Sequence, residues 1–214
     1  MQAWEKIFKK QGKVFLKPQE DMKKIIRMLK KEKAKKILDL GCGTGRHTVM
    51  LAKAGFDVYG MDISREGLRL TRQWLKKEGL NAVLKEASCY QKFPFKDKFF
   101  DAVISIQVIH HNYINKIRYC IKEIERVIKL GGIIFITVAA KKKRKQRAQS
   151  KKTAPRTYVP TIGGEKGLPH YIYNKELLKK DFKNFKILAL YKSPSQHYCI
   201  LGKLKERVNV VNKT

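Results

Sequence analysis

Three glycines directly follow a short apolar run and could bring the backbone close to a small ligand. They stand at positions 41, 43 and 45, after the run Lys36–Leu40, and glycine permits the tight turn and close approach that such a loop needs. The spacing is G-x-G-x-G and Arg46 follows, so the dinucleotide pattern G-x-G-x-x-G fails at its third glycine. The P-loop lysine is missing too. Asp39 stands two residues before the loop, where a carboxylate suits a cationic amine and would repel a pyrophosphate.

A second carboxylate, Asp62, ends the next apolar run, 17 residues after Gly45. A carboxylate at the end of a second strand can accept hydrogen bonds from both hydroxyls of a ribose. S-adenosylmethionine combines a ribose with an amino-acid ammonium and has no phosphate. We therefore predict this cofactor and a methyl-transfer reaction. The alternatives are a nucleotide-dependent oxidoreductase, disfavoured by Arg46 and Asp39, and a binding module of the same fold without activity.

These segments resemble the class I S-adenosylmethionine-dependent methyltransferases, and the resemblance covers roughly residues 36–205. ILDLGCGTG resembles the first motif of that family, VYGMDIS the second, and FFDAVISI and LGGIIFITV its fourth and fifth strands. The resemblance implies that Asp39, Gly41 and Gly43 hold the methionine end of the cofactor and that Asp62 holds the ribose.

The adenine contacts depart from the family pattern. Related sequences carry an Asp that accepts a hydrogen bond from the adenine amino group, whereas this chain reads Glu86-Ala87-Ser88-Cys89. Either Ser88 takes that position, or Glu86 reaches it by a shift in register. The remaining residues of the predicted cofactor site are Cys42, Gly45, Ile63, Cys89 and Gln107.

Two adjacent histidines, His110 and His111, follow the predicted fourth strand, where this fold places substrate chemistry. They are the only titratable pair with a neutral-range pKa in such a position. We predict that His111, or else His110, orients or deprotonates the methyl acceptor; a helix cap is the structural alternative. The stretch ISIQVIHH also resembles tRNA methyltransferases that esterify a carboxymethyl group on wobble uridine. A carboxylate acceptor needs no base, and the same His-to-Gln change would then mainly weaken acceptor binding.

The charge balance indicates a polyanionic partner. Lys and Arg number 49 against 18 Asp and Glu, a net charge of +31, and the segment Lys141–Lys152 holds eight basic residues in twelve. Such a run is expected to bind RNA with a strong dependence on salt, so we predict RNA, most simply tRNA, as acceptor. The alternatives are a small molecule, a protein acceptor, and a lysine-rich composition without function. The segment 140–173 is expected to form a lid, with Arg156, His170 and Tyr171 touching the acceptor.

Several classes of protein are not expected. The four cysteines lie at least 31 residues apart and form no zinc-type cluster with histidine, so we expect reduced thiols, no metal and a cytoplasmic protein. The longest nearly apolar stretch, Gly131–Ala140, has ten residues, against the roughly 18 that a membrane helix needs. A protein partner subunit remains possible.

The elements that must position these residues alternate between strand and helix periodicity, which predicts a parallel α/β sheet. We expect one doubly wound, seven-stranded, Rossmann-like domain with an antiparallel last strand. It divides into a basic helical segment (1–35), the cofactor-binding core (36–139), the basic lid (140–173) and a last helix with two strands (174–205). Expected helices cover 19–33, 44–54, 64–78, 114–129 and 174–182; expected strands cover 36–40, 57–61, 82–85, 100–106, 133–139, 185–191 and 197–204.

Overall fold

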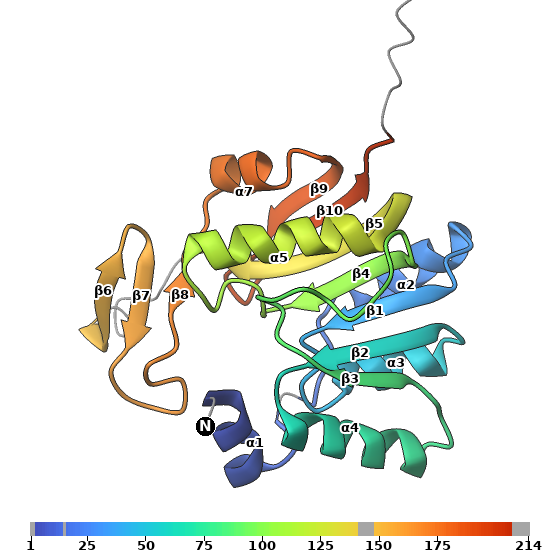
Figure 1. Cartoon of the computed structure of the whole chain (residues 1–214), viewed down its shortest axis with the longest axis horizontal. Helices are drawn as coiled ribbons and strands as arrows, with labels where there is room; N and C mark the ends of the chain where they lie inside the picture. The colour runs from blue at the N-terminus through green and yellow to red at the C-terminus, as the bar shows by residue number, and fades with distance from the viewer. Residues whose placement is uncertain (1–2, 15, 141–147, 207–214) are drawn as a thin grey trace, which may run out of the picture.

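The computed structural model describes residues 3–14, 16–140 and 148–206, and its centre is a seven-stranded sheet (Figure 1). The strand order is β3-β2-β1-β4-β5-β10-β9. The first five strands are parallel, and β10 pairs antiparallel with both β5 and β9. The predicted α/β class and antiparallel last strand are confirmed. The strands are β1 (Lys36–Leu40), β2 (Asp57–Asp62), β3 (Val83–Glu86), β4 (Phe100–Ile106), β5 (Ile128–Ala139), β9 (Phe185–Lys192) and β10 (His197–Leu204).

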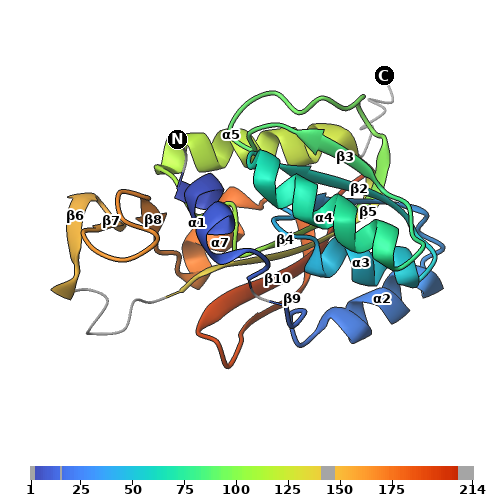
Figure 2. The same ribbon diagram turned by 90° about the horizontal axis from the view of Figure 1, so that it is seen from below.

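Helices cover both faces of this sheet (Figure 2). On one face, α5 (Ile114–Val127) and α7 (Lys175–Asp181) share a core with β1, β4, β5 and β10. On the other, α2 (Met22–Lys31) and α3 (Arg46–Lys53) pack on the opposite side chains of the same strands. Helices α1 (Ala3–Gln11) and α4 (Arg65–Lys77) contact each other beyond the β3 edge.

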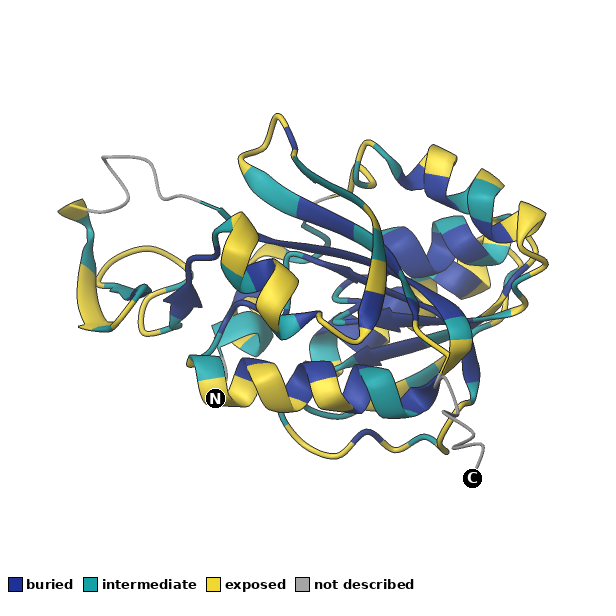
Figure 3. Ribbon diagram, turned by 90° about the horizontal axis from the view of Figure 1, so that it is seen from above, coloured by how far each residue is buried: buried dark blue, intermediate teal, exposed yellow. Residues whose placement is uncertain are grey.

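Burial on both faces explains why the central strands read as continuous apolar runs. In β4 only Asp101 is partly exposed, and Figure 3 shows the buried residues concentrated in the central sheet and its inward helix faces. This arrangement leaves the carboxyl ends of β1, β2, β4 and β5 together at one edge, where ligands bind in open α/β sheets.

The boundary between α5 and β5 differs from the prediction. The helix was expected to continue to Lys129 and stop at the glycine pair, but it ends at Val127 and β5 begins at Ile128. Gly131 has a φ of +71°, and the pairing with β4 skips from Ile128 to Ile133. The glycines therefore form an irregularity inside the strand, not the end of a helix.

The segment 140–173, expected to be a lid without regular structure, contains a second sheet. It consists of β6 (Ser150–Ala154), β7 (Thr157–Pro160) and β8 (His170–Tyr171), in that order and antiparallel. The sheet lies beyond the carboxyl ends of the central strands, at the left of Figure 1. β6 and β7 are short and only partly buried, and β8 has only two residues, so these strands carry no period that a sequence pattern detects.

The other boundaries agree with the predictions or differ from them by at most about three residues. The largest difference is at α2, which begins at Met22 because Gln19 turns the preceding chain: its Oε1 accepts a hydrogen bond from the Asp21 backbone N–H. Within the described part of the chain, no helix has both the length and the apolar character that crossing a membrane requires.

Candidate functional site

The glycine loop between β1 and α3 is closely packed on two sides. Gly41 and Gly45 have φ of +74° and +93°. A Cβ at Gly41 would lie 2.4 Å from Val108 Cγ2, and one at Gly45 would lie 2.7 Å from Thr71 Cγ2. Both the conformation and the contacts therefore require glycine at these two positions.

Asp62, at the carboxyl end of β2, holds this loop in place. Its Oδ2 accepts a hydrogen bond from the Gly43 N–H and its Oδ1 one from the Ser64 N–H, both at 2.8 Å. Burial raises the pKa of Asp62, and the bonds from Ser64 and Gly43 oppose that rise. The side chain remains partly exposed at the sheet edge, so it can receive a further donor.

Asp39 lies deeper than the sequence analysis expects. Its carboxyl group is buried and accepts a 2.6 Å hydrogen bond from Thr48 Oγ1. Burial raises its pKa to about 6. The side chain thus ties β1 to α3 beneath the glycine loop, and its contact with a cationic amine stays a prediction.

Helix α1 contributes side chains that the sequence analysis did not include in the site. Glu5 Oε2 accepts hydrogen bonds from Ser64 Oγ (2.6 Å) and from the Glu66 N–H (3.1 Å). The buried Phe8 ring packs over the loop, since a Cβ at Gly43 would lie 3.4 Å from its Cζ. No local pattern signals the two hydrogen bonds of Glu5, because they join residues 59 and 61 positions apart.

At the predicted adenine position, Ser88 and Glu86 have different surroundings. Glu86 is exposed and forms an ion pair with Arg65 at 2.9 Å. Ser88 is half-buried, and its Oγ accepts a hydrogen bond from the Tyr90 N–H. Glu86 therefore already has a charged partner, and the contact of Ser88 with adenine stays a prediction.

Other predicted cofactor residues lie around the same edge. Ile63 and Cys89 are half-buried there. The Cys42 thiol is buried toward β2, where a Cβ at Gly60 would lie 3.1 Å from its Sγ, and burial raises its pKa. The Cys42 side chain therefore packs on β2, and only its backbone is left to contact a ligand at the glycine loop. Gln107 has a φ of +62°, and its N–H donates to Thr137 Oγ1 at 2.9 Å.

The predicted acceptor residues meet beyond the end of β4. His110 and His111 are buried, with ring centroids 4.1 Å apart, and the His170 ring lies 4.7 Å from that of His111. The small sheet is held here by its backbone, because the Tyr171 N–H donates to the His110 carbonyl at 2.8 Å.

Arg156 and Tyr171 have different positions in this region. Arg156 lines a cavity of about 260 Å³ together with Lys152, Tyr158 and Ile172. The Tyr171 ring instead packs edge-on against Tyr173 in the core beneath α5. The structure thus brings His110, His111, His170 and Arg156 to one end of the sheet and turns Tyr171 inward. Residues 141–147 of the predicted basic run lie outside the described residues, while Lys151 and Lys152 are exposed on β6.

Residues 38–136 match the family described as a methyltransferase domain. Over these residues the chain is similar to a methyltransferase domain. A structure from Pyrococcus horikoshii superimposes with a TM-score of 0.72 at 25% identity, covering 96% of this chain and 100% of that one. A methyltransferase structure from Methanosarcina mazei, at 23% identity and a TM-score of 0.68, covers 80% of this chain and 93% of that one and shares the fold.

Curated relatives match about half of the chain. A ubiquinone biosynthesis O-methyltransferase from Pelagibacter ubique is 33% identical over 107 residues, which is 50% of this chain and 42% of that one. A tRNA (carboxymethyluridine(34)-5-O)-methyltransferase from Arabidopsis thaliana is 34% identical over 105 residues, 49% of this chain and 24% of that one. The chain spans about a quarter to a half of the length of these relatives.

The residues at this edge of the sheet fit S-adenosylmethionine. The glycine loop leaves no room for a Cβ at Gly41 or Gly45, and the Asp62 carboxylate stands at the end of β2, where a ribose is held in related folds.

Proposed function

We propose that this methyltransferase transfers a methyl group from S-adenosylmethionine to RNA, most simply to tRNA. The observation that carries the proposal is the position of the small basic sheet. Its exposed Lys151 and Lys152 lie on β6, and Arg156 and the buried His170 belong to the same sheet region, next to the histidine pair that follows β4.

The cofactor end of the site is built from the glycine loop and Asp62. Gly41 and Gly43 admit the methionine end close to the backbone, and the partly exposed Asp62 carboxylate accepts hydrogen bonds from the ribose hydroxyls. Ser88 serves the adenine side. When bound, the cofactor supplies a methyl group that is already activated on its sulfonium, so the chain's main task is in-line positioning of the acceptor.

The acceptor end is built from histidines and arginine. His111 and His110 follow β4 directly, and Arg156 lines a cavity on the small sheet together with Lys152. An RNA phosphate or a nucleobase carboxylate would find positive charge in Lys152 and Arg156 on that cavity wall. We propose that His111 positions the acceptor group, and that its replacement by Gln lowers turnover while leaving cofactor affinity unchanged.

The comparisons support two kinds of acceptor. The Arabidopsis relative acts on tRNA, in line with the net charge of +31. The Pelagibacter relative and a demethylmenaquinone methyltransferase from Geobacillus stearothermophilus, 36% identical over 116 residues, act on quinone-type small molecules by their names. A small-molecule acceptor is therefore the alternative. Because all four cysteines are free thiols, a cytoplasmic setting is part of the proposal.

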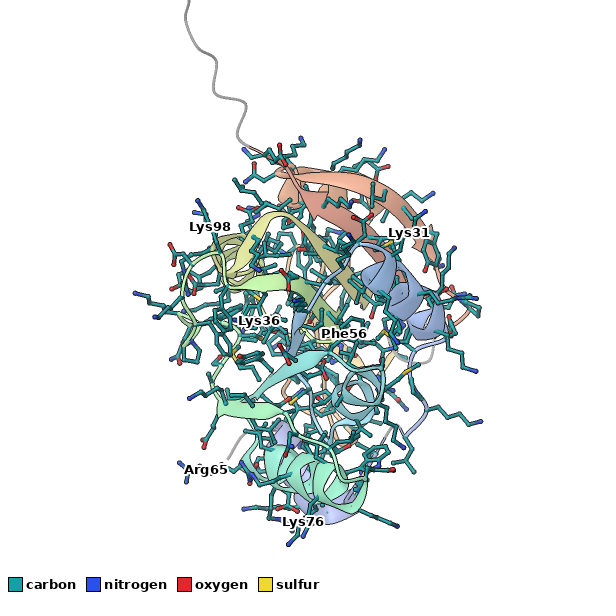
Figure 4. All side chains as sticks on the ribbon, turned by 90° about the vertical axis from the view of Figure 1, so that its right-hand side faces the viewer. Lys31, Lys36, Phe56, Arg65, Lys76 and Lys98 are labelled. Atoms are coloured by element: carbon teal, nitrogen blue, oxygen red, sulfur yellow. The ribbon has the colours of Figure 1, made fainter. Side chains whose placement is uncertain are left out.

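A salt titration of tRNA affinity tests the RNA assignment. The variant Lys151→Gln/Lys152→Gln removes two charges beside the acceptor end, and Lys30→Gln/Lys31→Gln removes two exposed charges at the end of α2. Figure 4 shows Lys31 on the side of the molecule that is opposite β6 in Figure 1.

We expect affinity to fall steeply with salt, by about 0.7–0.9 log units per log unit of salt for each phosphate contacted. The β6 variant should bind all RNAs more weakly with a reduced slope, and the α2 variant should bind like the wild type. Equal slopes for all three proteins, or an affinity independent of salt, would favour the small-molecule acceptor.

A further inference from the structure

Four of the five histidines of this chain gather at one place. From the His110 ring, the centroids of His111, His170 and His197 lie 4.1, 5.9 and 6.1 Å away. They come from three separate segments: the loop after β4, strand β8 and the start of β10. The fifth histidine, His47 on α3, accepts a hydrogen bond from the Gln19 N–H and takes no part.

Three of these imidazoles have the arrangement of a ligand set. His110, His111 and His170 are buried, and each presents one ring nitrogen so that the three atoms lie within 4.8 Å of one another. A metal–nitrogen bond of about 2.0–2.1 Å in a tetrahedral site places neighbouring ligand atoms about 3.3 Å apart. Small side-chain rotations would bring the three ring nitrogens from within 4.8 Å of one another to this ligand separation.

A carboxylate lies beside one of these imidazoles. Glu165 Oε2 lies 3.3 Å from His170 Nε2, the separation expected of two neighbouring ligands on one ion. This buried Nε2 makes no hydrogen bond among the described residues, so the geometry of the pair is not that of a hydrogen bond. The His197 ring, whose Nδ1 lies 3.3 Å from Ser195 Oγ, stays outside the set.

We propose that His110, His111, His170 and Glu165 bind a divalent transition-metal ion. Three imidazoles and one carboxylate suit zinc or another late first-row ion and are a poor set for Mg²⁺ or Ca²⁺, which prefer oxygen ligands.

The ligands join two parts of the fold. His110 and His111 belong to the central sheet's edge, whereas His170 and Glu165 belong to the small sheet and the loop that leads into β8. A bound ion would therefore fix the small sheet against the end of the central sheet. The ion site shares His111 with the proposed acceptor end but uses no residue of the cofactor end. The test below measures metal binding alone, so the ion site and methyl transfer can fail separately.

Cobalt titration of the untagged, chelator-treated full chain tests the site. We expect one equivalent of Co²⁺ to give the visible bands of a tetrahedral nitrogen–oxygen site, Zn²⁺ to displace it, and Zn²⁺ to raise the Tm. His170→Gln should weaken Co²⁺ binding more than about 100-fold, beyond the 10–100-fold typical of losing an outer-shell partner. His47→Gln, which changes the histidine outside the cluster, should bind like the wild type.

Glu165→Gln guards against a folding defect in the buried His variant, because Glu165 is only half-buried on a loop. We expect it to weaken binding at least about 10-fold. The proposal is overturned if the wild type gives no cobalt spectrum, if His170→Gln or Glu165→Gln binds Co²⁺ as the wild type does, or if sulfur-to-cobalt charge-transfer bands show that cysteines hold the ion.

Discussion

Replacing Asp62 tests whether the end of β2 builds the cofactor site. Asp62→Ala removes both acceptors that hold the loop, the 2.8 Å bonds from the Gly43 and Ser64 N–H groups. A hydrogen bond to a charged group contributes about 1.5–3 kcal/mol, so loss of the two bonds disorders the loop at a cost of about 3–6 kcal/mol. If about half of that cost falls on binding, affinity drops about 10- to 100-fold, since 1.4 kcal/mol is tenfold. The lost ribose bonds add to this loss.

The assay is calorimetric titration with S-adenosylhomocysteine, with circular dichroism to confirm that each variant is folded. Asp57→Ala is the matched control, because Asp57 is an exposed residue at the opposite end of the same strand. We expect the control to bind like the wild type and Asp62→Ala to bind at least about 100-fold more weakly. A folded Asp62→Ala protein with an affinity within about threefold of the wild type would refute the assignment of the site.

Two further predictions concern the folded state around the loop. Burial raises the pKa of Asp39 to about 6, so the folded state binds an extra proton between about pH 4 and pH 6. The contribution of Asp39 to the free energy of unfolding therefore falls, by on the order of 3 kcal/mol, as pH rises through that window. Chemical denaturation should show that the free energy of unfolding of the wild type, relative to that of Asp39→Asn, falls as pH rises from about 4 to 6. A difference between the two proteins that stays constant with pH would contradict this prediction. Gly45→Ala should lower the Tm more than Gly55→Ala: both glycines have φ near +90°, but only at Gly45 does the new methyl meet Thr71. Equal decreases in Tm would show that Thr71 moves aside without a loss of stability, and would contradict this prediction.

The bounds of three strands were predicted to the residue: β1, β4 and β10. For β1 and β4 the reason is physical, since a strand buried on both faces must be apolar throughout. The start of β5 was wrong because a glycine pair ends a helix more often than it interrupts a strand. The small sheet was missed because β6 is largely exposed and β8 has only two residues.

The site shows a similar division. The glycine loop and the position of Asp62 could be predicted from local spacing, because residues that follow parallel strands lie at the carboxyl edge of the sheet. The inward orientation of Asp39 depends on Thr48, and the contact of Glu5 with Ser64 depends on how α1 docks. Neither leaves a local signal.

The histidine cluster was only partly predictable. His110 and His111 are adjacent in the sequence, and the antiparallel pairing of β10 with β5 places His197 opposite Ala139, at the same edge. His170 joins them through the small sheet, which the sequence pattern did not reveal. The expectation of no metal rested on sequence spacing alone. It stays a prediction, and the cobalt titration decides between it and the proposed ion site.

Transfer of tritiated methyl groups tests the central claim most directly. The wild type and Asp62→Ala would each be incubated with labelled S-adenosylmethionine and, separately, total tRNA and a protein-free metabolite fraction. The proposed function predicts label in tRNA with the wild type and little with Asp62→Ala. Label confined to the metabolite fraction, or no label in either fraction from a wild type that binds S-adenosylhomocysteine, would contradict methyl transfer to RNA.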